Sequence, residues 1–231
     1  MVVPVWRIRR SGDVLKGIGL AIAGLAWVAL MAVASVASIV TADDELLRDD
    51  FEGEKSFSTD VDAHVSLRYA NGGYEILIKD PDFPQEARSF FNEPAQPAVS
   101  FSAAARIVEG PEEDMVIGLG CYPSAEYGYV LAVSPTGQYV VFQSFRDRLP
   151  EFMTEGQADP LRDRGETNRI SITCRGGGTE PTILQLSVNG DEVVRHEDPD
   201  GYDSFVAVGF YVATAQAGTL VRFDEALAER A

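Results

Sequence analysis

The sequence predicts an all-β domain, either a two-sheet sandwich or a barrel, preceded by a single transmembrane helix. Beyond Asp49, apolar residues recur at every second position, which is the period of a strand with one buried face. Turn-forming residues separate these segments, and helical periodicity is almost absent. Before them, residues 17–40 contain no charged side chain, which is typical of a membrane span.

Nine segments are expected to form strands, most of them by their alternation of apolar and polar residues. They are Tyr74–Ile78, Val99–Ile107, Met115–Tyr122, Tyr127–Val133, Gln138–Gln143, Asn168–Cys174, Leu184–Val188, Phe205–Val212 and Thr219–Phe223.

Turn signals lie between these strands, at Asn71-Gly72-Gly73, Pro135-Thr136-Gly137 and Gly176-Gly177-Gly178. The strongest is Asn189-Gly190, because a type I′ turn needs positive φ at both central residues. It predicts a hairpin that joins Ile183–Val188 to Glu192–Val194.

Three segments lack a strand pattern. Ala42–Arg48 and the tail near Ala226 allow a short helical turn, and residues 144–167 form the longest irregular stretch. That stretch is rich in Arg, Asp, Pro and Gly, a composition that suits either a functional loop or a surface insertion.

The uncharged segment Gly17–Val40 would be about 36 Å long as a helix, enough to cross about 30 Å of hydrocarbon. Basic residues precede it and acidic residues follow, so the positive-inside rule places the short tail in the cytoplasm and the rest outside. Val40-Thr41-Ala42 also has the small residues of a signal-peptidase site, which leaves secretion after cleavage near Ala42 as the alternative. We expect an uncleaved anchor, an organisation typical of a bacterial envelope protein.

The predicted organisation has four parts: a cytoplasmic tail (1–16), a transmembrane helix or signal anchor (17–40), a linker (41–48) and one β-sandwich domain (49–231). The chain of 231 residues has a net charge of −17. Four of its 19 basic residues and one of its 36 acidic residues precede residue 17, so the remainder carries 15 basic and 35 acidic residues, a net charge of −20. Such a surface repels phosphate backbones, so we expect no nucleic-acid partner.

Cys121 is in phase with the apolar residues of its strand, and Cys174 is in phase with Ile170 and Ile172. Two inward cysteines in an exported domain predict a disulfide, with two buried thiols as the alternative. A pair of cysteines and two distant histidines, His64 and His196, do not make a metal site.

The order of several segments resembles the concanavalin A-like, LamG-like jelly-roll, in the branch near 3-keto-disaccharide hydrolases and related domains of unknown function. The segments are DDFEG from Asp49, YANGGYEILIKDPD from Tyr69, GLGCYPSAEYGYVLAVSPTGQYVVF from Gly118, NRISITCRGG from Asn168, LSVNGDEV from Leu186 and VRFDEAL from Val221. The resemblance covers nearly all of residues 49–227. It implies a jelly-roll of two antiparallel sheets whose first and last strands lie side by side, with both cysteines where related extracytoplasmic domains place a pair.

Sugar-binding sites combine aromatic faces with polar side chains. The candidate residues here are four tyrosines on adjacent predicted strands and three polar residues of the long loop: Tyr122, Tyr127, Tyr129, Tyr139, Arg146, Asp147 and Arg148. The tyrosines alternatively pack in the core or cover a sheet edge. Asp198, Asp200 and Asp203 offer carboxylates to calcium, although a polar turn before the strand at Phe205 explains them more simply.

Catalytic motifs are missing from the sequence. It contains no GxSxG, HExxH or P-loop pattern, and its acidic clusters do not have the strand spacing of glucanase carboxylates. We therefore predict no catalytic residue and no cofactor apart from a possible calcium ion. The expected function is a membrane-anchored module that binds a glycan or another envelope component. A hydrolase of the 3-keto-disaccharide type and a purely structural ectodomain are the alternatives.

Overall fold

The computed structural model describes residues 44–231 except 54, 82–84, 92, 112 and 147. Within this part of the chain every regular element is a β-strand, which confirms the all-β class. No helix in it is long and apolar enough to cross a membrane. The segment 17–40, expected to span the membrane, lies outside the described residues.

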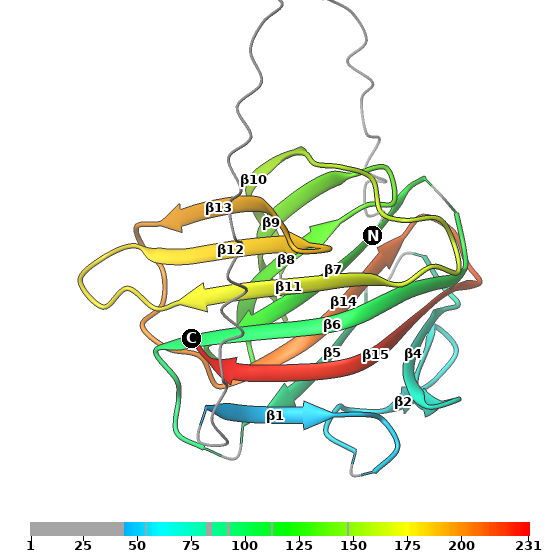
Figure 1. The fold of residues 1–231 in the computed structure, drawn as a ribbon, viewed down its shortest axis with the longest axis horizontal. Helices are drawn as coiled ribbons and strands as arrows, with labels where there is room; N and C mark the ends of the chain where they lie inside the picture. The colour runs from blue at the N-terminus through cyan, green and yellow to red at the C-terminus, as the bar shows by residue number, and fades with distance from the viewer. Residues whose placement is uncertain (1–43, 54, 82–84, 92, 112, 147) are drawn as a thin grey trace, which may run out of the picture. The chain divides into compact units, whose positions relative to one another are not determined.

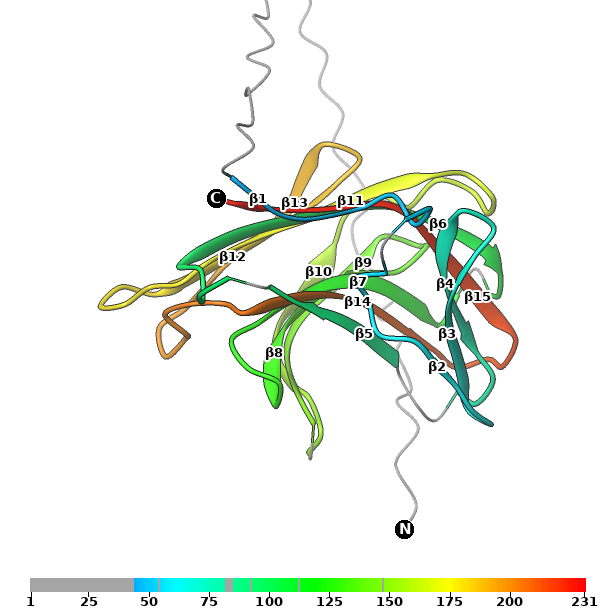
Figure 2. The same ribbon diagram turned by 90° about the horizontal axis from the view of Figure 1, so that it is seen from below.

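Two antiparallel sheets pack face to face as a sandwich (Figures 1 and 2). One sheet has nine strands: β13 (Asp191–Asp198), β12 (Thr182–Val188), β11 (Asn168–Arg175), β6 (Ala98–Glu109), β15 (Thr219–Arg230), β4 (Gly73–Ile78), β3 (Val65–Ala70) and β2 (Asp60–Val61) in that order, with β1 (Glu45–Asp49) also paired to β15. The other has six strands in the order β10 (Glu151–Gln157), β9 (Gln138–Phe145), β8 (Tyr127–Val133), β7 (Met115–Tyr122), β14 (Ala207–Thr214) and β5 (Gln85–Phe90).

Each predicted turn lies between two strands of the structure. Asn189 and Gly190 have φ values of 54° and 98°, and β12 pairs with β13 as predicted for this hairpin. Asn71 and Gly72 likewise have positive φ, at 55° and 71°, between β3 and β4. Asparagine and glycine are the residues that adopt this left-handed backbone at least cost.

The expectation of a short helical turn at Ala42–Arg48 and near Ala226 is wrong for the residues that the structure describes. Glu45–Asp49 forms β1, and the tail near Ala226 belongs to β15, which continues to Arg230. The two segments pair with each other, Asp49 with Ala226 and Glu45 with Glu229. Their backbone partners lie about 180 positions away in sequence, so no local pattern reveals them. The pairing confirms that the first and last strands lie side by side.

The long irregular stretch at 144–167 is also only partly irregular, since it contains β10. This strand pairs with β9 at the edge of the six-stranded sheet, with a register shift between Phe152 and Thr154. As an edge strand its residues are mostly exposed or half-buried, so it lacks the apolar alternation that marks a buried strand.

The disulfide Cys121–Cys174 is confirmed, with the two Cα atoms 6.6 Å apart. Cys121 lies on β7 of the six-stranded sheet and Cys174 on β11 of the nine-stranded sheet. The bond therefore links the two layers covalently across the core.

Aromatic rings fill one part of the core between the sheets. Phe210 of β14 is their centre, with ring centroids 4.2 Å from Phe223, 4.4 Å from Phe57 and 5.6 Å from Phe101. All four side chains are buried. Because they come from both sheets, these contacts hold the sandwich together.

We expect stability to fall as the pH rises above about 10, the ordinary pKa of tyrosine. Burial raises the pKa of Tyr74, Tyr122 and Tyr211 above that value, so each keeps its proton in the folded state when the unfolded chain has lost it. The unfolded state then binds fewer protons, and the free energy of unfolding decreases with pH. Urea unfolding between pH 8 and pH 11.5 measures this slope. Tyr74→Phe is expected to make it shallower, and a stability constant to pH 11.5 would contradict the account.

Candidate functional site

The outer face of the six-stranded sheet, which points away from the core, is the strongest candidate for a binding surface. Its residues alternate along each strand with those of the core. They include Glu86, Arg88 and Phe90 of β5, Gly209 and Tyr211 of β14, Gly118, Gly120 and Tyr122 of β7, Gly128 and Val130 of β8, and Phe142 and Ser144 of β9.

This face is concave, as contacts between side chains of strands that are not neighbours show. The rings of Phe142 on β9 and Tyr211 on β14 have centroids 5.2 Å apart, although β8 and β7 lie between those strands. In a flat sheet three strand spacings would separate them by roughly 14 Å. Ser144 of β9 also donates a hydrogen bond to Glu86 of β5, at the opposite edge of the sheet. The bend of this sheet at β8, away from the nine-stranded sheet, is visible in Figure 2.

Glycines in the floor of the concave face leave room for a tyrosine ring. A side chain at Gly120 or Gly128 would collide with the ring or hydroxyl of Tyr122, and one at Gly209 would crowd the same ring. Tyr122 therefore lies against the sheet and is fully buried. The guanidinium carbon of Arg88 lies 4.0 Å from the centroid of this ring. Tyr122, a predicted ligand-binding residue, is thus the support beneath Arg88.

Arg88 is fixed by polar contacts as well as by this ring. Its Nε donates to Glu86 over 3.0 Å, a second guanidinium nitrogen pairs with the same carboxylate, and Nη1 donates to the carbonyl oxygen of Ala125 over 2.7 Å. Glu86 accepts a further hydrogen bond from Ser144. The three polar side chains are therefore held in place before any ligand arrives.

A depression of about 340 Å³ opens on this face, and we call it the concave pocket. Its lining residues are Glu86, Arg88, Phe142, Ser144, Phe145, Arg146, Arg148, Leu149, Pro150 and Tyr211. Three large apolar side chains on or beside this face are exposed: Phe90 by 50%, Leu149 by 72% and Phe152 by 54%. Exposed apolar groups gathered around fixed polar ones are typical of a ligand-binding surface.

The predicted loop residues Arg146 and Arg148 line the concave pocket, and Asp147 between them lies outside the described residues. Arg146 forms an ion pair with Glu126, with 3.4 Å between nitrogen and oxygen. The guanidinium carbon of Arg148 lies 3.5 Å from the ring centroid of Phe145.

The remaining predicted tyrosines lie elsewhere. Tyr127 is half-buried at one end of the sandwich, where its ring stacks on Tyr202 at 4.8 Å. Tyr129 is buried, and its hydroxyl donates to the Asp198 carboxylate over 2.6 Å. Tyr139 is half-buried and packs over Gly156 of β10. The structure therefore does not bring the four tyrosines together in one site.

Asp198 takes part in contacts that join the two sheets. Besides the bond from Tyr129, its carboxylate accepts from the Gln143 amide over 3.2 Å and from the backbone N–H of Asp200 over 3.1 Å. Burial and this carboxylate raise the pKa of Tyr129. Asp200 and Asp203, the other predicted calcium ligands, are exposed. Among the described residues no group of three or more acidic, histidine or cysteine side chains is placed to hold a metal ion.

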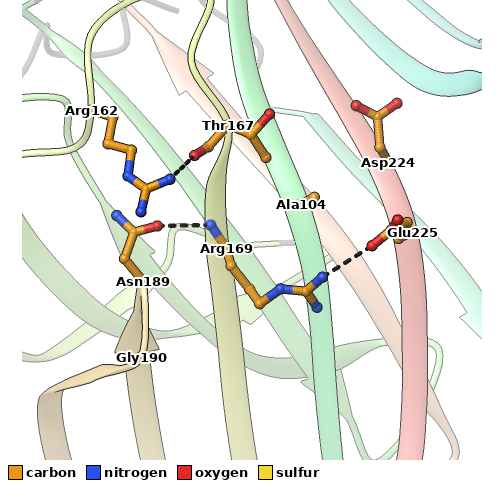
Figure 3. Close-up of a pocket in the computed structure, with 8 residues that line it drawn as sticks. All are labelled: Ala104, Arg162, Thr167, Arg169, Asn189, Gly190, Asp224 and Glu225. Atoms are coloured by element: carbon orange, nitrogen blue, oxygen red, sulfur yellow. Dashed lines mark hydrogen bonds and ion pairs between the residues drawn. The ribbon is translucent and has the colours of Figure 1, made fainter.

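A second hollow, of about 540 Å³, lies over the nine-stranded sheet (Figure 3). Arg169 extends across it to Glu225, with 3.0 Å between nitrogen and oxygen. Arg162 donates to the carbonyl oxygen of Thr167 over 3.0 Å. Two arginines and two acids line this hollow, so its charges balance.

Sequence reasoning missed Glu86, Arg88, Phe142, Ser144 and Tyr211 as site residues. They come from three strands, and only the curvature of the sheet brings them together. One local signal was present: Gly118 and Gly120 occupy successive outward positions of β7, which indicates that something lies close above that strand.

No model of a known protein family matches the sequence, and neither does any curated protein. Solved structures do match the fold. A Bacillus subtilis protein of unknown function with a galectin-like fold has a TM-score of 0.57 at 12% identity, over 81% of this chain and 96% of that one. The carbohydrate-binding module CBM66 of Bacillus subtilis has a TM-score of 0.52 at 12% identity, over 75% and 95%. Alginate lyase vAL-1 of a Chlorella virus has a TM-score of 0.52 at 9% identity, over 72% and 89%. At these identities the likeness shows a shared β-sandwich fold and nothing about ligand or activity.

Proposed function

We propose that this chain is a membrane-anchored, extracytoplasmic and non-catalytic module that binds a glycan in the concave pocket. The observation that carries the proposal is the concave face itself, where aromatic rings lie beside polar groups that are fixed in advance. Sugars present apolar ring faces together with hydroxyl groups, so they need both kinds of partner. Phe142 and Tyr211 form a largely buried apolar floor, half-buried Phe145 adds an aromatic ring beside it, and Arg88 and Ser144 supply hydrogen-bonding groups.

The lining of the concave pocket favours binding over hydrolysis. Most glycosidases use two carboxyl groups about 5–5.5 Å or 6.5–9.5 Å apart. Among the described residues that line the pocket, Glu86 is the single carboxylate, and it already accepts hydrogen bonds from Arg88 and Ser144. A hydrolase of the 3-keto-disaccharide type and a purely structural ectodomain remain the alternatives that an assay has to exclude.

We expect the full-length protein, purified in detergent, to bind at least one member of a panel of bacterial and plant polysaccharides. Arg88→Ala is expected to weaken that binding by about 10-fold or more, because Arg88 is a preorganised hydrogen-bond donor in the pocket. Isothermal titration measures the affinity, and a thermal melt checks that the variant is folded. Leu149→Ser is a second variant expected to weaken binding. Leu149 is exposed on the pocket rim, so its replacement leaves the fold intact.

Arg169→Ala is the matched control, because it removes an ion-paired arginine from the hollow over the other sheet. It is expected to leave glycan binding unchanged. Binding of no polysaccharide would remove support for the glycan proposal, and turnover of a glycoside would favour the hydrolase.

Anchoring is proposed from the uncharged segment 17–40 and from the charges on either side of it. In cells, we expect the protein to sediment with membranes and to resist extraction by carbonate. A protease added outside the cytoplasmic membrane is expected to cleave the domain. Full release into the medium as a chain that begins near residue 43 would favour secretion instead.

A further inference from the structure

The concave pocket gathers positive charge in a strongly acidic protein. After residue 16 the chain has 15 basic and 35 acidic residues. Three of those 15 basic residues, Arg88, Arg146 and Arg148, line the pocket, against Glu86 as the one acid among its described lining residues. The hollow over the nine-stranded sheet has two of each. The excess of arginine is therefore a property of the concave pocket and not of every depression on the domain.

These arginines differ in how their charge is balanced. Arg88 is ion-paired with Glu86, and its bonds to Glu86 and Ala125 use three of its five N–H groups, which leaves two for a ligand. Arg146 forms an ion pair with Glu126 at the surface, where the two side chains are 71% and 62% exposed. This ion pair therefore adds little stability, and an anionic ligand can displace Glu126 from it. Within the part of the chain that the structure describes, no carboxylate lies within ion-pair distance of Arg148, whose guanidinium rests on Phe145.

This arrangement suits a carboxylate or sulfate group. A guanidinium binds such an anion through two parallel hydrogen bonds, which are stronger than bonds to a neutral hydroxyl. Aromatic rings beneath Arg88 and Arg148 hold the planar guanidinium groups in place, and a ring contact does not neutralise their charge as a carboxylate does. The domain as a whole has far more acidic than basic residues, which disfavours binding of an anionic chain outside the arginine-lined pocket.

We propose that the occupant of the concave pocket is an anionic polysaccharide, whose carboxylate or sulfate groups pair with Arg88, Arg146 and Arg148. The inference rests on the proposed glycan-binding function and names the class of glycan. It also assigns a role to the two loop arginines: they select for charge, while the aromatic residues contact the sugar ring.

The test compares polysaccharides that share a backbone and differ in charge. Polygalacturonic acid is titrated beside its fully methyl-esterified form, and dextran sulfate beside dextran, with full-length protein in detergent. We expect the charged member of at least one pair to bind about 10-fold or more tightly than its neutral partner, which corresponds to about 1.4 kcal/mol. Its affinity is expected to fall as sodium chloride is raised. A preference in the first pair alone identifies a carboxylate ligand, and in the second alone a sulfate ligand.

The variant Arg146→Gln/Arg148→Gln is expected to abolish the preference for charge without changing the melting temperature, since both side chains are exposed. Arg169→Gln is the matched control and is expected to keep the preference. Equal binding of charged and neutral members would overturn the inference and leave the glycan-binding function standing. A preference lost in Arg169→Gln and kept in the double variant would overturn the assignment to this pocket. Binding of neither member of either pair, together with failure of the wider panel, would overturn both proposals.

Discussion

Replacement of both Cys121 and Cys174 by alanine is expected to lower the free energy of unfolding by about 4 kcal/mol. The disulfide closes a loop between residues 53 positions apart, and opening it returns that conformational entropy to the unfolded chain. The bond also joins β7 to β11 across the core, and both cysteine side chains are fully buried. For a domain of this size the loss corresponds to a fall in melting temperature of roughly 8–16 °C.

Urea unfolding of the wild-type and variant proteins measures this difference. Reductant is expected to lower the stability of the wild type toward that of the variant and to leave the variant unchanged. A variant within about 1 kcal/mol of the wild type would mean that the inter-sheet link adds little to the packed core.

Phe210→Ala is expected to cost about 3–5 kcal/mol, the range for removal of a large buried aromatic side chain. Phe210 is fully buried and lies against Phe223 of the opposite sheet and against Phe57 of the segment between β1 and β2, so its loss opens a cavity that these rings cannot fill by small movements. Its chain neighbours Gly209 and Tyr211 belong to the concave face, and a shift of β14 there would also disturb ligand binding.

Phe90→Ala is the control for this variant, because Phe90 lies on the adjacent strand β5 and is 50% exposed. It is expected to change stability by less than about 0.5 kcal/mol. Chemical denaturation of the two variants gives both values. Equal effects would contradict the placement of Phe210 at the centre of the core.

The sequence predicted the parts of the fold that depend on local pattern. The strands Met115–Tyr122 and Tyr127–Val133 were predicted with the bounds that the structure gives them, because one side of each strand carries apolar residues into the core. The hairpin at Asn189-Gly190 was predicted because its backbone conformation restricts the residue types. Strands whose pairing is distant in sequence, such as β1, or whose residues are exposed, such as β10, were missed.

The candidate site was predictable only in part, for the same reason. Arg146 and Arg148 were recognised as polar loop residues, and both line the concave pocket. Tyr122 was predicted to contact the ligand through its ring. The ring instead packs against Gly120 and Gly128, and Arg88 covers it. Glu86 and Ser144 meet across three intervening strands, a contact that follows from sheet curvature and not from spacing along the chain.

Amide hydrogen exchange with and without a bound polysaccharide tests most directly whether the concave face is the binding surface. We expect the ligand to slow exchange in β5, in the C-terminal half of β9 and in the described part of the loop 146–150, with no change in β11 and β12 around the hollow over the other sheet. Protection confined to that hollow, or to the end of the sandwich where Tyr127 stacks on Tyr202, would contradict the account and move the site to those residues.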